Sequence, residues 1–151
     1  MATALAYPNS IISLVAADIA PVAYQPRHDA VFAALESLPL EGHTDRRFAL
    51  AHLQAGGIDE ATAQFLLKNL QRTDTGFRWK LNLNGLKSCY PNIIGWHNPP
   101  GKSQLVFAGP SLFLRGGDSN YVTAEHRDEI VHQFPQVQAK TLAGCGHWLH
   151  A

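Results

Sequence analysis

The stretch IISLVAAD, residues 11–18, decides the fold class of this chain. The residues before Asp18 are almost all apolar, and a short run of this kind is typical of a strand buried on both faces, as in a parallel sheet. Pro21 follows soon after and cannot donate to a strand ladder, so the strand must end near Asp18. An aspartate at the carboxyl end of a parallel strand stands where open α/β sheets place their ligand sites.

Two further strands are predicted near the other end of the chain. SLFLR, residues 111–115, is a second short apolar run, and VQAKTL, residues 137–142, alternates between apolar and polar side chains. Between them, Thr123 is a good helix cap, although His126 stands where the glutamate of a capping box is expected. The helix that follows should end at Pro135. Strands that alternate with helices predict an α/β fold with a parallel sheet.

The long middle of the chain has a mainly helical pattern. Residues 77–83, FRWKLNL, are the exception, because they alternate and suggest a short extended segment. Apolar residues recur at helical spacing over residues 28–38, 45–53, 59–70 and 85–94, and Asp59 can cap the third of these helices.

These patterns predict three parts of the chain. The middle part is expected to be a helical cap, or lid, that is inserted between strands of the core. The expected parts are residues 1–23 with the end of a helix and a core strand, residues 24–100 with the lid, and residues 101–151 with the last core strands.

Charge and cysteine content exclude several kinds of partner. Lysine plus arginine and aspartate plus glutamate number 12 each, and no run of like charges occurs, so we expect neither nucleic acid nor a membrane as partner. The two cysteines, Cys89 and Cys145, and the lack of a signal-peptide pattern predict a cytoplasmic protein. No CxxC or HxxxH motif occurs, so we expect no metal and no other cofactor.

Each predicted strand is followed by a residue that can take part in proton transfer. Asp18 follows the first strand, Asp118 the second, and His147 lies in the loop after the third. The carboxyl ends of parallel strands lie at one edge of a sheet, so these side chains can converge. A carboxylate that is hydrogen-bonded to a histidine fixes its tautomer and stabilises the imidazolium. Acid before histidine is also the chain order of α/β-hydrolases, in which the serine comes first.

Four stretches make a resemblance to this fold family specific. The sequence resembles the short-cap α/β-hydrolase esterases of bacteria, which are related to the mitochondrial abhydrolase-domain hydrolases. The resemblance covers essentially the whole chain and implies a partial α/β-hydrolase fold with an inserted helical cap. The stretches are VAADIAPVAY (15–24), FLLKNLQRTDTGFRWKLNLNGL (65–86), GPSLFLRGGDSNYV (109–122) and AGCGHWLHA (143–151).

The resemblance implies a serine hydrolase, a carboxylesterase or thioesterase that acts on small acyl esters or thioesters. His147 would be its general base, and Asp18 or Asp118 the acid partner of that histidine. The DIAP aspartate resembles the acid used by short-cap esterases, and some relatives carry asparagine in place of Asp118, so Asp18 is slightly favoured and both stay candidates. Ser119, in the turn GGDSN, is interpreted as a turn hydroxyl.

No G-x-S-x-G nucleophile elbow occurs in the sequence. In the family this elbow precedes a helix similar to MATALAYP, residues 1–8, so we expect the chain to correspond to the C-terminal part of the fold and to be inactive alone. The alternatives are an inactive fragment, or split-protein or interaction module, and another α/β-hydrolase chemistry, that of a dehalogenase or epoxide hydrolase. Without the preceding strands, the sheet should have an exposed edge through which the chain self-associates.

Overall fold

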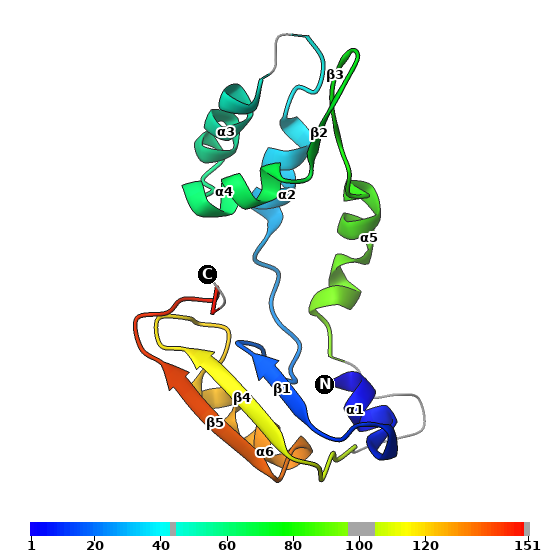
Figure 1. Ribbon diagram of the computed structural model, residues 1–151, viewed down its shortest axis with the longest axis vertical. Coiled ribbons are helices and arrows are strands. Elements are labelled where there is room, and N and C mark those ends of the chain that lie inside the picture. The colour runs from blue at the N-terminus through cyan, green and yellow to red at the C-terminus, as the bar shows by residue number, and fades with distance from the viewer. Residues whose placement is uncertain (43–44, 97–104, 150–151) are drawn as a thin grey trace. The chain divides into compact units, whose positions relative to one another are not determined.

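The computed structural model describes residues 1–42, 45–96 and 105–149, and the chain divides into two units (Figure 1). Unit 1 consists of Met1–Tyr24 and Gly95–Ala151, and unit 2 of Gln25–Ile94. Each unit contains a hydrophobic core of its own. The lid was expected over residues 24–100, of which residues 97–100 lie outside the described residues.

Unit 1 is built on a three-stranded parallel sheet with the strand order β1-β4-β5. Leu14 pairs with Ser111 and Ser111 pairs with Val137, so the carboxyl ends of the three strands lie at one edge of the sheet. This parallel sheet with helices confirms the predicted α/β class. The strands are β1 (Leu14–Ala17), β4 (Ser111–Gly116) and β5 (Val137–Leu142).

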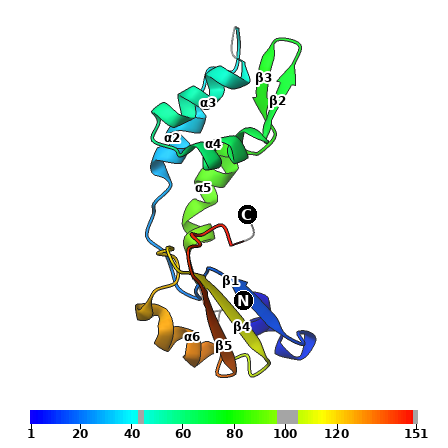
Figure 2. The ribbon, with the colours of Figure 1, turned by 60° about the vertical axis from the view of Figure 1, so that its left-hand side comes forward.

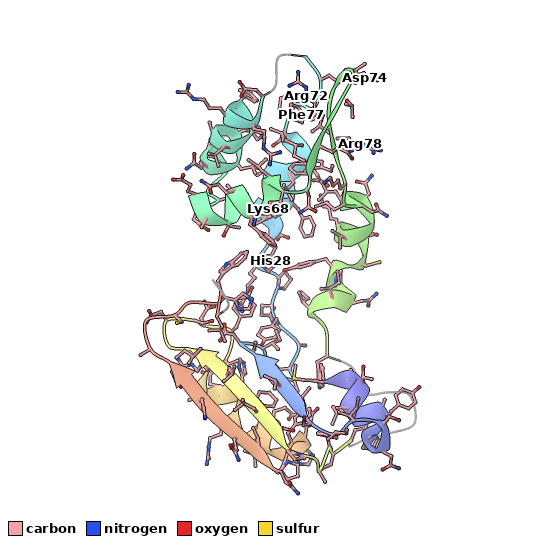
Figure 3. All side chains as sticks on the ribbon, in the orientation of Figure 1. His28, Lys68, Arg72, Asp74, Phe77 and Arg78 are labelled. Atoms are coloured by element: carbon pink, nitrogen blue, oxygen red, sulfur yellow. The ribbon has the colours of Figure 1, made fainter. Side chains whose placement is uncertain are left out.

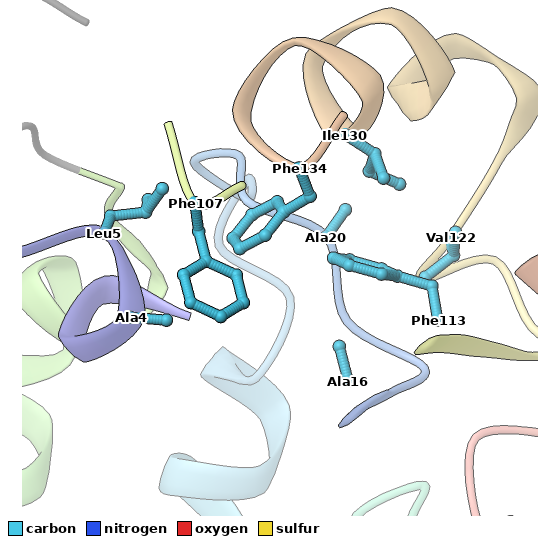
Figure 4. Close-up of a cluster of buried hydrophobic side chains, with 9 residues drawn as sticks. All are labelled: Ala4, Leu5, Ala16, Ala20, Phe107, Phe113, Val122, Ile130 and Phe134. Carbon is cyan, nitrogen blue, oxygen red and sulfur yellow. The ribbon is translucent and has the colours of Figure 1, made fainter. Parts of the chain in front are cut away.

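One face of this sheet is covered by α6 (Arg127–Gln133), whose Ile130 and the following Phe134 join Phe113 in the core (Figure 4). The ring of Phe134, directly after α6, lies 5.4 Å from that of Phe113 on β4 and 6.3 Å from that of Phe107. His126 replaces the expected capping glutamate, because its Nδ1 accepts a hydrogen bond from the Thr123 N–H at 3.2 Å. The helical segments of unit 1 are α1 (Ala2–Ala6), η1 (Pro8–Ser10), η2 (Ala124–His126) and α6 (Arg127–Gln133).

The expectation that residues 11–17 form a strand buried on both faces is wrong. The strand comprises only Leu14–Ala17, and its side chains differ sharply in exposure because they alternate between the two faces. Ala16 is 4% exposed and belongs to the core, whereas Val15 is 62% exposed. Ile12, just before the strand, is 92% exposed. Neither of these two apolar side chains is therefore covered by the described part of the chain.

Unit 2 consists of four helices and a β-hairpin (Figure 2). Asp45 and Asp59 cap two of the helices, accepting hydrogen bonds from the N–H groups of Phe48 at 2.7 Å and Thr62 at 3.0 Å, which confirms the cap predicted at Asp59. The Trp79 Nε1–H donates to the Leu35 carbonyl at 3.2 Å and ties the hairpin to α2. The elements are α2 (Asp29–Ser37), α3 (Arg46–Ala55), α4 (Glu60–Leu67), β2 (Leu70–Thr73), β3 (Gly76–Trp79) and α5 (Leu83–Ile94).

The hairpin corrects the predicted end of the third helix. Helix α4 ends at Leu67, and Leu70 begins β2, where it pairs with Trp79 of β3. The turn depends on Gly76, whose φ is +150° and where a Cβ would lie 2.2 Å from the Leu40 carbonyl oxygen. Figure 3 labels Arg72, Asp74, Phe77 and Arg78 along this hairpin. Among the described residues, no helix is both long enough and apolar enough to cross a membrane.

Candidate active site

Asp18 follows β1 directly and is fully buried. Its φ of +51° lies in the left-handed region, which few residues other than glycine adopt, aspartate and asparagine among them. Its N–H still continues the ladder of β1 and β4, donating to the Leu114 carbonyl at 2.7 Å. The backbone thus turns at the end of the strand, and the carboxylate reaches the residues that follow β4.

Three donors surround the Asp18 carboxylate. The Gly116 N–H donates to Oδ1 at 3.0 Å, and the Ser119 hydroxyl and the His147 Nδ1–H, the latter at 2.8 Å, both donate to Oδ2. Burial by itself raises the pKa of Asp18, but the hydrogen bonds from Ser119, Gly116 and His147 together outweigh it and hold the pKa below its ordinary value. Asp18 is therefore a carboxylate at neutral pH.

The loop that carries His147 is held against the end of β4 by the backbone. A Cβ on Gly116 would lie 2.2 Å from the Gly146 carbonyl oxygen, so only glycine allows this approach. The Asp118 N–H donates to the Cys145 carbonyl at 3.0 Å. Gly116, at the end of β4, therefore allows the histidine loop to come within reach of the Asp18 carboxylate.

The ring of His147 is oriented from two sides. Its Nδ1 faces Asp18, and one face of the imidazole stacks on Tyr121, with ring centroids 3.8 Å apart and an interplanar angle of 17°. Tyr121 is held in turn by the Tyr24 hydroxyl, which donates to its carbonyl at 2.8 Å and accepts from the Ala20 N–H at 2.8 Å. The His147 side chain is still 43% exposed.

Of the three site residues predicted from the sequence, the structure brings two together. Asp18 and His147 are in contact, whereas Asp118 is exposed, and within the described residues its carboxylate forms no ion pair with His147. Two further residues of the site were not predicted from the sequence: Ser119, interpreted as a turn hydroxyl, donates to Asp18, and Tyr121 stacks on His147. The only signal for either residue is its position in the loop directly after Asp118.

This arrangement can perform proton transfer. With its Nδ1–H donating to the Asp18 carboxylate, the neutral imidazole keeps a lone pair on Nε2, and Nε2 makes no hydrogen bond within the described residues. A carboxylate so placed stabilises the imidazolium that forms when Nε2 accepts a proton. Among the described residues, no group of three histidine, cysteine, aspartate or glutamate side chains is placed to hold a metal ion.

Comparison with known proteins gives clear relatives, although no family model matches the sequence. The chain is 40% identical over 150 residues to esterase YbfF of Escherichia coli, an alignment that covers 99% of this chain and 55% of that protein. It is 35% identical over 158 residues to the mouse sn-1-specific diacylglycerol lipase ABHD11, covering 100% of this chain and 50% of the lipase. The chain thus spans about half the length of the curated relatives that it matches.

A solved structure matches the described fold closely. It is an esterase from a marine microorganism, similar to this chain with a TM-score of 0.86 and 31% sequence identity. The match covers 97% of this chain and 58% of that esterase. The two units of this chain therefore both have counterparts in one solved hydrolase.

Proposed function

Because this chain belongs to the α/β-hydrolase family, as a relative of its esterases and abhydrolase-domain proteins, we propose that it carries the acid and the histidine of an ester-hydrolase catalytic triad. The observation that carries the proposal is the 2.8 Å contact between His147 Nδ1 and Asp18 Oδ2. In this proposal Asp18 is the acid and His147 the base, and Asp118 serves only through its backbone.

The proposed reaction is the hydrolysis of small acyl esters or thioesters. His147 Nε2 takes the proton of a serine as that serine attacks the acyl carbonyl, and later gives it to the leaving alcohol or thiol. The serine belongs to a G-x-S-x-G elbow, which this sequence does not contain. The names of the two curated relatives, an esterase and a diacylglycerol lipase, support an ester as substrate.

In this proposal unit 2 is the lid that shields the acyl group from water. Helix α5 supports the proposal, because it has no buried residue although it carries several apolar ones. Leu86, 42% exposed, and Ile93, 58% exposed, lie on one side of this helix at helical spacing. An acyl chain is a suitable partner for such a stripe. The free thiols of Cys89 and Cys145 support the proposed cytoplasmic location.

The acid–histidine pair can be tested on the chain as it is. A histidine N–H that donates to a buried carboxylate gives a strongly downfield proton resonance, which we expect from His147 Nδ1–H. Asp18→Asn should abolish this resonance, whereas Asp118→Asn should leave it in place. Retention in Asp18→Asn, or loss in Asp118→Asn, would refute the assignment of the acid.

The hydrolase activity can be tested in a chimera in which this chain replaces the matching part of the E. coli esterase. We expect hydrolysis of p-nitrophenyl acetate, a loss in kcat of about 10⁶-fold with His147→Ala and about 10⁴-fold with Asp18→Asn, and little change with Asp118→Asn. The chain alone should show no turnover above that of its own His147→Ala variant. Equal small losses from both aspartate variants in a folded chimera would contradict the proposal.

A further inference from the structure

Unit 1 contains a pocket that the proposed hydrolase chemistry does not use. It lies between α6 and the strands β4 and β5, has a volume of about 390 Å³, and includes neither Asp18 nor His147 among its lining residues. Figure 2 shows α6 beside these two strands. The walls are mainly apolar, and they are formed by Phe113, Val122, Ile130, Val131, Val137 and Ala139.

The polar side chains at this pocket include two arginines. Arg115, near the end of β4, and Arg127, the first residue of α6, both line it. The Arg115 Nε is buried and has no hydrogen-bond partner in the described part of the chain. Buried polar atoms nearly always have a partner, and Arg115 also lines the pocket, so its guanidinium group is a candidate donor to a ligand bound here.

The charge of the pocket is positive and uncompensated. No aspartate or glutamate is among its described lining residues, and neither Arg115 nor Arg127 forms an ion pair with another described residue. A guanidinium binds a carboxylate through two parallel hydrogen bonds, and this bond is strengthened where water is excluded. Positive charge within apolar walls therefore suits a ligand that has an anionic head and a hydrocarbon tail.

We propose that this pocket binds the carboxylate of a short- to medium-chain fatty acid. The carboxylate accepts hydrogen bonds from Arg115, with Arg127 adding positive charge, and the hydrocarbon chain lies along Val131, Val137 and Ala139. The volume suits a chain of about eight carbons, near the lower end of ordinary ligand pockets. A nucleotide or a free phosphate fits less well, because the walls are mainly apolar and would face its polar groups.

The proposal is independent of the proposed hydrolase function, because the pocket and the Asp18–His147 pair share no residue. The direct test is titration of the chain with octanoate. Binding is monitored by calorimetry and by the NMR signals of the methyl groups of Val131 and Ala139. We expect saturable binding of octanoate. Octanol, which lacks the carboxylate, and inorganic phosphate, which lacks the hydrocarbon chain, should each bind at least about tenfold more weakly. Equal binding of octanol and octanoate, or of phosphate and octanoate, would overturn the proposal.

Two adjacent positions on α6 give a matched pair of variants. Val131 lines the pocket and is 45% exposed, whereas His132 is exposed and is not among the lining residues. Val131→Asp should weaken octanoate binding at least about tenfold by repulsion of the carboxylate, and His132→Asp should leave it within about twofold. Arg115→Met keeps the aliphatic stem and should abolish binding without loss of the fold. Equal effects of the two aspartate variants would show that the ligand does not occupy this pocket.

Discussion

The carboxylate of Asp18 keeps its negative charge although no part of the residue is exposed. Ser119, Gly116 and His147 make this possible by donating three hydrogen bonds to it. A buried charge with this many donors is stable only while the donors stay in place. The candidate site therefore depends on the folded state, and the folded state depends on the ionisation of Asp18.

Low pH should lower the free energy of unfolding, because it protonates Asp18. The pKa of Asp18 in the folded chain lies below the 3.8 expected when unfolded, so its contribution to stability is present above pH 3.8 and is lost as the pH falls through the folded value. Urea unfolding at a series of pH values should show this decline. Asp18→Asn is the control, because it removes the titrating group. An equally steep decline in that variant would show that another carboxylate is responsible.

Ser119 should contribute more to stability than an ordinary buried serine. Its hydroxyl donates to a charged carboxylate, and hydrogen bonds to charged groups contribute about 1.5–3 kcal/mol. Ser111, also buried in unit 1, donates to the neutral Gly109 carbonyl at 3.2 Å and is the matched control. In urea unfolding, Ser119→Ala should lower the free energy of unfolding more than Ser111→Ala does. Equal losses of free energy in the two variants would mean that the charge of Asp18 does not strengthen its hydrogen bond with Ser119.

The sequence predicted His147 with Asp18 or Asp118 as its acid and favoured Asp18 only slightly, and the structure places Asp18 in contact with His147. Asp18 and Asp118 both follow apolar strands, and nothing in the local pattern records that only Asp18 has a positive φ and a buried carboxylate. Ser119 was missed for a similar reason. A serine within GGDSN is readily explained as a turn residue. Its hydrogen bond to Asp18 joins residues 101 positions apart, so no local pattern predicts it.

At the scale of elements, the β2–β3 hairpin is the part of unit 2 most sensitive to backbone geometry. Gly76→Ala would place a methyl group 2.2 Å from the Leu40 carbonyl oxygen, against backbone that cannot move aside. Gly57 has a φ of +84° and open space within 4 Å of the point where a Cβ would lie, so it is the control for conformational strain alone. Gly57→Ala should lower the free energy of unfolding by about 1–2 kcal/mol, and Gly76→Ala should lower it by clearly more. Thermal or urea unfolding measures both. Equal costs would contradict the predicted clash.

The loops after β1 and β4 are joined by the hydroxyl of Tyr24. Tyr24→Phe removes this hydroxyl and leaves the Ala20 N–H and the Tyr121 carbonyl without that partner, which should lower the free energy of unfolding by about 1–2 kcal/mol. Tyr7, 66% exposed, is a suitable control, and Tyr7→Phe should change stability little. Amide exchange at Ala20 should also become faster in Tyr24→Phe. Unchanged exchange would show that the bond does not hold the loop.

Most elements were predictable because their signals are local. The strands β1, β4 and β5 follow from short apolar or alternating runs, and the start of α4 follows from Asp59 as a cap. Strand β2 was missed because LQRT does not alternate and because Leu70 continues the helical spacing of the residues before it. Its strand conformation is set by the pairing of Leu70 with Trp79, which no local pattern encodes.

At the scale of the whole chain, β1 is an edge strand of the described sheet, with exposed apolar side chains on it and just before it. Within the described residues it pairs only with β4, and Val15 and Ile12 are exposed. An unprotected edge of this kind is a template for pairing with a second chain. We therefore keep the prediction that the chain self-associates through this edge.

Sedimentation at increasing concentration should detect this association, and a charge on the edge should prevent it. Val15→Lys is expected to shift the chain toward monomer. Phe48, 48% exposed on α3 of unit 2, is the control for a general loss of apolar surface. Phe48→Lys should leave the association unchanged. A monomer at every concentration would refute the prediction.

The division into units has a consequence for how such a protein can change over evolutionary time. Within the described part of the chain, Asp18 and Tyr121 orient His147 and both lie in unit 1, whereas residues 25–94 form one continuous unit with a separate core. Insertions, deletions and even wholesale replacement of that segment leave the proton-transfer pair with its own scaffold. The inserted segment can therefore vary without rebuilding the Asp18–His147 pair, and laboratory exchange of this segment between relatives has a natural pair of junctions.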